Sequence, residues 1–194
     1  MTPERSGKLL SVLSKRQASL TVILENIEDP HNVSAALRSC DAVGIQDVYV
    51  VNNKDPRRKR WGYRSSSSAY KWLSVHQYSD LDECIATVKK NYSKIFTTHL
   101  SSDAVSLYEL DLTESVALVF GNEHFGVSEE LRAMADGNFL IPQVGIIKSL
   151  NISVACAVSI YEAYRQRNAA GMYDAPTLPE QRLAEIKQEW GFLE

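Results

Sequence analysis

The sequence has few of the residues that build disulfide frameworks or metal centres. Its three cysteines, Cys40, Cys84 and Cys156, are odd in number and widely spaced, which excludes a disulfide framework and a paired-cysteine zinc site. His99 and His124 are not spaced as metal ligands, and no other ligand set is evident. We therefore expect a reducing compartment and no bound metal.

Long hydrophobic runs are also missing. Hydrophobic residues make up 44% of the chain, but five charged side chains interrupt residues 1–20, which therefore predict neither a signal peptide nor a membrane span. We expect a soluble cytoplasmic protein without a membrane partner.

Two phosphate-binding motifs are absent as well. No G-x-G-x-x-G follows the first predicted strand, and no G-x-x-x-x-G-K-[ST] occurs anywhere. Their absence speaks against a standard dinucleotide fold and against P-loop nucleotide hydrolysis.

The charge of the chain is slightly negative overall but strongly positive in one place. The 194 residues carry a net charge of −3, so the protein is not a general polyanion binder. Residues 54–71, which we call the basic segment, hold seven basic residues and a single acid, Asp55. Any contact with nucleic acid is therefore expected to be local.

Strands and helices alternate along the chain. Leu20–Leu24 is a short apolar run typical of a strand buried on both faces, a helix follows from Pro30 to Gly44, and Val48–Val51 is the next strand. The further elements are helix 81–90, strands 94–98 and 116–120, helix 128–135, strand 139–141 and helix 151–167. This order predicts an α/β fold with a mostly parallel sheet and helices on both faces.

The chain fits one main domain with a short extension. Its length suits a single hydrophobic core, which we place in residues 1–168. Residues 169–194 are predicted to form a linker, rich in proline at 171–179, and a last helix near Glu180–Trp190.

Three unusual loops follow predicted strands. They are Thr97–Leu100, Gly121–Gly126 and Ile141–Asn151. Ligands of open α/β sheets gather at the carboxyl ends of the strands, so these loops are expected to line one pocket.

Three ordered motifs in these regions resemble the SpoU branch of the SPOUT methyltransferases. They are Asn32–Arg38, then Gly121-Asn122-Glu123 with Gly126, and then Ile141-Pro142 followed by Ser149-Leu150-Asn151-x-Ser153. Two further stretches resemble the TrmH subgroup, which methylates a D-loop guanosine of transfer RNA: the basic segment with its end Lys71-Trp72-Leu73, and the tail from Met172-Tyr173-Asp174 through Glu189-Trp190.

The resemblance implies a trefoil knot near the C-terminus, a homodimer whose second subunit helps to form the site, and S-adenosylmethionine as cofactor. The implied substrate is transfer RNA, methylated on a ribose 2′-hydroxyl. By position, the implied cofactor contacts are Thr98, His99, Leu100, Gly121, Ile141 and Leu150. Without the resemblance, the three apolar residues among these would be ordinary core residues.

The implied catalytic residues are Arg38, Asn32, Glu123, Ser149 and Asn151, and each has a purely structural alternative. Arg38 would otherwise be a helix-surface arginine in a salt bridge, Asn32 a helix N-cap, and Glu123 a turn carboxylate. Ser149 and Asn151 would otherwise only cap the last long helix. Arginine stays protonated in proteins, so we assign to its guanidinium the holding of a phosphate and the stabilisation of a developing alkoxide.

The basic segment interleaves cations with Trp61 and Tyr63, a pattern that suits phosphate contacts and base stacking. A solvated basic loop is the alternative. The predicted RNA contacts are Arg57, Arg58, Lys59, Arg60 and Arg64, with Arg165 and Arg167 extending the footprint. Rival functions are methylation of ribosomal RNA or of the transfer-RNA wobble position, and a catalytically silent RNA-binding module.

Replacing Arg57, Arg58 and Arg60 by alanine is expected to weaken RNA binding and to flatten its salt dependence. Each lost phosphate contact lowers the slope of log K against log salt by about 0.9 for a duplex. Filter binding between low and physiological salt measures both effects, and an unchanged slope would move the footprint elsewhere.

Overall fold

The computed structural model describes residues 2–54, 69–102, 104–147 and 149–192. Within these ranges, one seven-stranded sheet has the order β3-β2-β1-β6-β4-β7-β5, and every neighbouring pair is parallel. The strands are β1 (Leu20–Glu25), β2 (Asp47–Val51), β3 (Ser74–Tyr78), β4 (Lys94–Thr98), β5 (Val105–Ser106), β6 (Val116–Phe120) and β7 (Gly137–Leu140).

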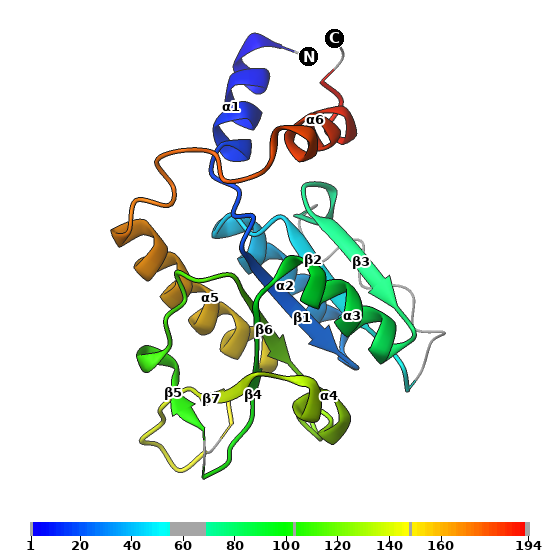
Figure 1. Ribbon diagram of the computed structural model, residues 1–194, viewed down its shortest axis with the longest axis vertical. Coiled ribbons are helices and arrows are strands. Elements are labelled where there is room, and N and C mark those ends of the chain that lie inside the picture. Colours follow the sequence, from blue (N-terminus) through cyan, green and yellow to red (C-terminus); the bar gives the residue numbers. More distant parts are fainter. Residues whose placement is uncertain (1, 55–68, 103, 148, 193–194) are drawn as a thin grey trace.

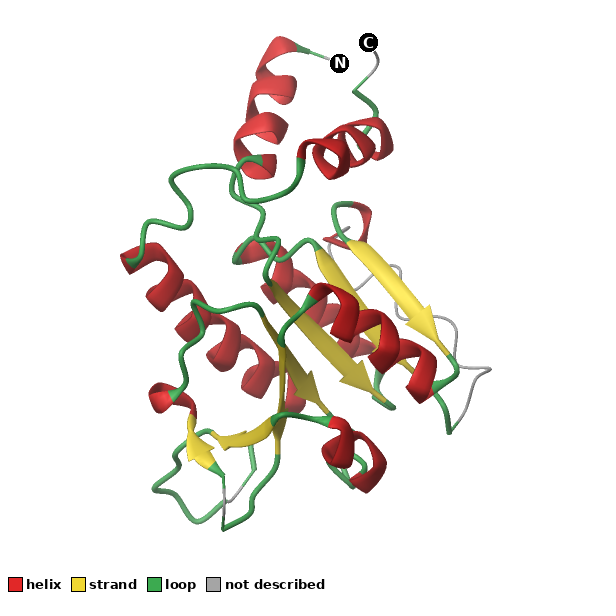
Figure 2. Cartoon of the chain, in the orientation of Figure 1, coloured by secondary structure: helices red, strands yellow, loops and turns green. Residues whose placement is uncertain are grey.

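Helices cover both faces of this sheet, as Figures 1 and 2 show. They are α1 (Pro3–Leu13), α2 (Pro30–Ala42), α3 (Leu81–Asn91), α4 (Glu129–Met134), α5 (Ile152–Ala169) and α6 (Glu180–Glu189), with 3-10 turns η1 (Ala69–Lys71) and η2 (Leu107–Glu109). The predicted α/β class with a parallel sheet is confirmed. The trefoil knot stays a prediction.

The central strand β1 explains the two layers. All its residues are buried, and alternate side chains point to opposite faces of the sheet. Val22 and Leu24 join the core under α2 and α5, whereas Ile23 joins the core under α3 and α4. The continuous apolar run in the sequence is therefore the signature of a strand that is covered twice.

The helix α2 begins and ends for identifiable reasons. Asp29 is its N-cap, with Oδ1 accepting a hydrogen bond from the N–H of His31 at 2.8 Å, and Pro30 occupies the first turn. The cap interpretation of Asn32 is thus wrong, because Asp29 already fills that position. The helix stops before Gly44, whose φ of +83° and close approach to the Lys15 carbonyl leave no room for a side chain.

The sequence does not predict the helix α1, the strand β3, the two-residue strand β5 or the two 3-10 turns. Strand β7 begins two residues earlier and ends one residue earlier than the predicted 139–141. The strand begins with Gly137-Asn138, which are not hydrophobic, so hydrophobic periodicity does not indicate its first two residues.

The C-terminal helix α6 packs against the N-terminal helix α1. Ile186 and Trp190 form a small apolar cluster with Leu13 and Leu178, and Figure 1 shows the two helices side by side at one end of the molecule. Among the described residues, no helix is both long and apolar enough to cross a membrane.

Arg167 corrects one sequence expectation. It was assigned to the RNA footprint, but its side chain is fully buried between the ends of the strands. Its guanidinium donates to the carbonyl oxygens of Ser19, Leu112 and Glu114 and to the side chains of Gln17 and Ser19, at 2.6–3.2 Å. Burial lowers the pKa of Arg167 to about 10, so the group stays charged at neutral pH. Arg167 therefore holds chain segments together and is not available to RNA.

Replacing Arg167 by alanine is expected to lower the free energy of unfolding by about 3 kcal/mol or more, because several buried carbonyl oxygens lose their donor. Urea unfolding measures this change. Arg165→Ala, on the exposed side of the same helix, is the matched control and should change stability far less. Equal effects of the two substitutions would contradict the structural role of Arg167.

Candidate active site

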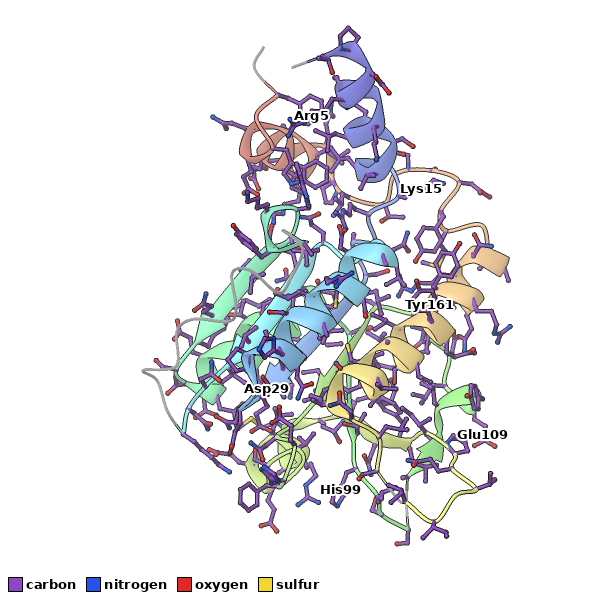
Figure 3. All side chains as sticks on the ribbon, turned by 180° about the vertical axis from the view of Figure 1, so that it is seen from behind. Arg5, Lys15, Asp29, His99, Glu109 and Tyr161 are labelled. Atoms are coloured by element: carbon purple, nitrogen blue, oxygen red, sulfur yellow. The ribbon has the colours of Figure 1, made fainter. Side chains whose placement is uncertain are left out.

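A cavity of about 570 Å³ opens at the carboxyl ends of β4, β6 and β7. Its size is in the usual range for small-molecule sites. All six residues predicted as cofactor contacts line it, together with three of the predicted catalytic residues: Thr98, His99, Leu100, Gly121, Ile141 and Leu150, with Glu123, Ser149 and Asn151. Figure 3 shows His99 and Asp29 at this end of the molecule, away from Arg5 of α1.

The loop after β4 is held by a residue of β7. The Asn138 side-chain amide donates to the His99 carbonyl at 2.8 Å and to Ser101 Oγ at 2.7 Å. Thr98 Oγ1 donates to the Val119 carbonyl at 3.0 Å. These bonds fix the backbone of 98–101 at the cavity wall. Asn138 was missed because it precedes the predicted strand.

The loop after β6 is a tight turn from Gly121 to Gly126. The N–H groups of Asn122 and Gly126 each donate to the other residue's carbonyl, at 3.0 and 2.9 Å. A Cβ atom on Gly121 would lie 2.2 Å from the Gly126 carbonyl carbon, so this position requires glycine. Asn122 Oδ1 accepts the N–H groups of His124 and Phe125, which makes the turn rigid.

Glu123 uses both carboxylate oxygens to hold the start of α2. Its Oε2 accepts the Glu28 N–H at 2.9 Å, and its Oε1 accepts the Asp29 N–H at 3.2 Å and Asn32 Nδ2 at 2.9 Å. Partial burial alone would raise the pKa of Glu123, but these hydrogen bonds outweigh it and the net pKa lies below the ordinary value. The ionised carboxylate therefore stabilises the folded state above pH 4.5, and this contribution is lost as the pH falls through the lowered pKa.

Asn32 extends this contact to the last long helix. Asn151 Nδ2 donates to Asn32 Oδ1 at 3.1 Å, while Asn151 Oδ1 caps α5 by accepting from the Ser153 N–H and Oγ. The capping interpretation of Asn151 is thus confirmed, but the residue also belongs to the Glu123–Asn32–Asn151 chain of hydrogen bonds. Ser149 is exposed at the cavity and does not cap α5.

Arg38 lies apart from this chain. It is exposed on α2, about 9 Å along the helix axis from Asn32, and it does not line the cavity. Among the described residues Arg38 has no ion pair, so the salt-bridge alternative gains no support. The resemblance also implies that the side-chain amide of Asn32 orients Arg38, but this amide is hydrogen-bonded to Glu123 and Asn151.

The predicted RNA contacts separate into three groups. Arg57, Arg58, Lys59, Arg60 and Arg64 lie outside the described residues. Arg165 is exposed but forms a two-pronged ion pair with Glu162, with distances of 2.9 and 2.7 Å. Arg167 is buried, as described above.

Replacing Glu123 by glutamine is expected to loosen the start of α2. An amide has only one oxygen, so its NH₂ group would face at least one of the three donors that the carboxylate now accepts. Native-state hydrogen exchange at pH 7 should show faster exchange of the Glu28 and Asp29 N–H groups.

Glu130→Gln, on the exposed first turn of α4, is the control for this experiment and should leave those amides unchanged. Unaltered exchange in the Glu123 variant would mean that the Asp29 cap holds α2 without the carboxylate.

Comparisons with known proteins identify the family of this chain. The family model described as the SpoU rRNA methylase family matches residues 19–161. The chain is 40% identical to a Thermus thermophilus protein named tRNA (guanosine(18)-2′-O)-methyltransferase, over 97% of this chain and 96% of the relative.

Solved structures give the same result. The Aquifex aeolicus TrmH/SpoU tRNA modifying enzyme has a TM-score of 0.89 at 35% identity and covers 97% of this chain and 95% of its own. The SpoU methyltransferase AviRb from Streptomyces viridochromogenes, solved with AdoMet, has a TM-score of 0.71 at 25% identity, over 82% and 62% of the two chains. The chain therefore belongs to the SpoU methylase family.

Proposed function

We propose that this protein transfers a methyl group from S-adenosylmethionine to the ribose 2′-hydroxyl of guanosine 18 in the D-loop of transfer RNA. The observation that carries the proposal is the similarity, over 97–99% of this chain, to relatives that bear this activity in their names. Two Xanthomonas relatives named 23S rRNA (guanosine-2′-O-)-methyltransferase match a smaller share of the chain, 78%.

The residues around the cavity fit the proposed cofactor. Leu100, Ile141 and Leu150 supply apolar surface for an adenine ring, and the rigid loops present backbone N–H and C=O groups to a ribose and an amino acid moiety. The cofactor supplies an electrophilic methyl group on a sulfonium.

Arg38 is assigned to the RNA and not to the cofactor. Its exposed guanidinium can hold a phosphate next to the target and stabilise the oxyanion that develops at the 2′-oxygen. The Glu123–Asn32–Asn151 chain holds the start of α2, the helix that carries Arg38, so these residues position Arg38 and do not touch the reacting atoms themselves. Ser149 lies at the cavity and contributes a hydroxyl towards the substrate.

The proposed active form is a homodimer in the cytoplasm. Arg38 does not line the cavity of its own chain, and Val154 and Tyr161 expose apolar surface on α5, the helix that packs against α2. A second copy on this surface would bring an Arg38 side chain to a cavity that lacks one. The buried, unpaired cysteines suit a reducing compartment.

The test is to incubate the protein with labelled S-adenosylmethionine and unmodified transfer RNA, digest the RNA and identify the product by mass spectrometry. The expected product is 2′-O-methylguanosine at position 18. Label at the wobble position, or only in ribosomal RNA, would overturn the substrate, and label in neither RNA would overturn the enzymatic function.

Replacing Arg38 by alanine should lower kcat by about 100-fold or more, in the range seen for loss of one oxyanion-stabilising donor. Binding of S-adenosylmethionine, measured by calorimetry, should change by less than about twofold. Lys89→Ala, on α3 at the other face of the sheet, controls for loss of a surface charge. Equal losses of transfer and cofactor binding would contradict this assignment.

A further inference from the structure

Phe125 is a large aromatic side chain held in solvent at the cavity. Its side chain is 75% exposed although it lines the cavity, and it belongs to neither of the cores beside the sheet. The turn beneath it is rigid, since its backbone N–H donates to Asn122 Oδ1 at 3.1 Å and Gly126 has a φ of +68°. The exposed position of the ring is therefore built into the fold.

A cation covers one side of this ring. Lys54, from the loop after β2, places its Nζ over the Phe125 ring at 5.3 Å from the centroid. The two residues are far apart in the sequence and come from different loops. Lys54 also begins the basic segment, whose predicted RNA contacts start three residues later at Arg57.

Asn26 holds the two loops in a fixed relation. Its Oδ1 accepts the Lys54 N–H at 3.2 Å, and its Nδ2 donates to Asn53 Oδ1 at 2.6 Å. On the other side, its carbonyl accepts Asn122 Nδ2 at 2.8 Å. Asn26 makes these contacts in the left-handed region, with φ of +50°, which asparagine adopts more readily than other side chains do.

We propose that Phe125 and Lys54 form a stacking platform for the nucleobase of the target nucleotide. The base would stack on the face of the Phe125 ring that Lys54 leaves open, with its ribose directed to the cavity, while the Lys54 cation attracts the flanking phosphate. This inference rests on the proposed function and adds a residue pair that recognises the substrate.

The surroundings of the ring favour an RNA base over a protein partner. Apolar anchors at protein interfaces sit in patches of other apolar side chains. The side chains recorded against the Phe125 ring are instead polar, namely the His124 ring and the Lys54 cation. One aromatic face beside a positive charge is the arrangement that nucleic-acid sites use for single bases.

The experiment compares Phe125→Ala and Phe125→Trp with the wild type. Tyr108→Ala is the matched control, because Tyr108 is also an exposed aromatic residue, at 57%, but does not line the cavity. Phe125→Ala should lower kcat/KM for transfer RNA about tenfold or more, which is the scale of one lost stacked base. Phe125→Trp keeps an aromatic ring and should retain the kcat/KM of the wild type. The affinity for S-adenosylmethionine and the mass in solution should not change.

A second transcript separates stacking from general damage. When the target nucleotide keeps its ribose but lacks its base, the wild type should lose the same factor, and Phe125→Ala should then cost nothing further. Persistence of the full effect on this transcript would overturn the inference.

Three other outcomes would also overturn it. Loss of cofactor affinity in Phe125→Ala would make the ring a cofactor contact, a change in mass would place it between two copies, and an unchanged kcat/KM would leave it without a role. If the wild type methylates no RNA, the proposed function fails separately. The transfer-RNA affinities of the same variants, measured by filter binding, would then test the stacking platform separately from the reaction. Phe125→Ala should bind transfer RNA more weakly than the wild type, and an unchanged affinity would contradict the platform.

Discussion

The carboxylate of Glu123 is the contact on which the arrangement of the site depends. It lies on the loop after β6, yet it binds the first N–H groups before α2 and, through Asn32, reaches the cap of α5. Both oxygens are used, so the carboxylate fixes the loop in two directions. Loss of this one group would remove the hydrogen bonds that tie the β6 loop at the cavity to the start of α2.

Buried arginines play the corresponding part at the opposite end of the strands. Arg16 donates to Asp41, Ile45 and Trp72, and Arg167 donates to three carbonyl oxygens from the two loops that precede β1 and β6. A guanidinium carries five donors and no acceptor, so it can satisfy several buried carbonyl oxygens at once. Buried guanidinium groups thus hold the loops together at one end of the strands, whereas the cavity opens at the other end.

Much of this could be predicted from the sequence because burial leaves a periodic signal. The structure confirms the buried strand β1, the helix α2 between its proline and glycine, and the common pocket of the loops after β4, β6 and β7. The sequence could not tell an exposed cation from a buried one, so Arg165 and Arg167 were treated alike although only Arg165 is accessible. The sequence does not reveal the role of Asn26 and Asn138, and it shows Asn122 only as part of a motif, because an asparagine that ties two loops looks in the sequence like one that only makes a turn.

The site has rigid loops around the cavity and exposed side chains outside it, and the proposed cofactor and RNA substrate need these two kinds of surface. In the proposed function, backbone groups of the loops would hold the cofactor, and Asn138 and Asn122 fix the backbone of these loops by hydrogen bonds. A folded RNA must instead be met by side chains that reach outwards, and Arg38, Lys54 and Phe125 are all exposed. Asn26 and Glu123 link the two parts. Asn26 binds the β6 loop and the backbone of Lys54. Glu123 belongs to the β6 loop and binds the start of α2, the helix that carries Arg38. Substrate recognition can therefore depend on few surface residues while the cavity beneath them stays unchanged.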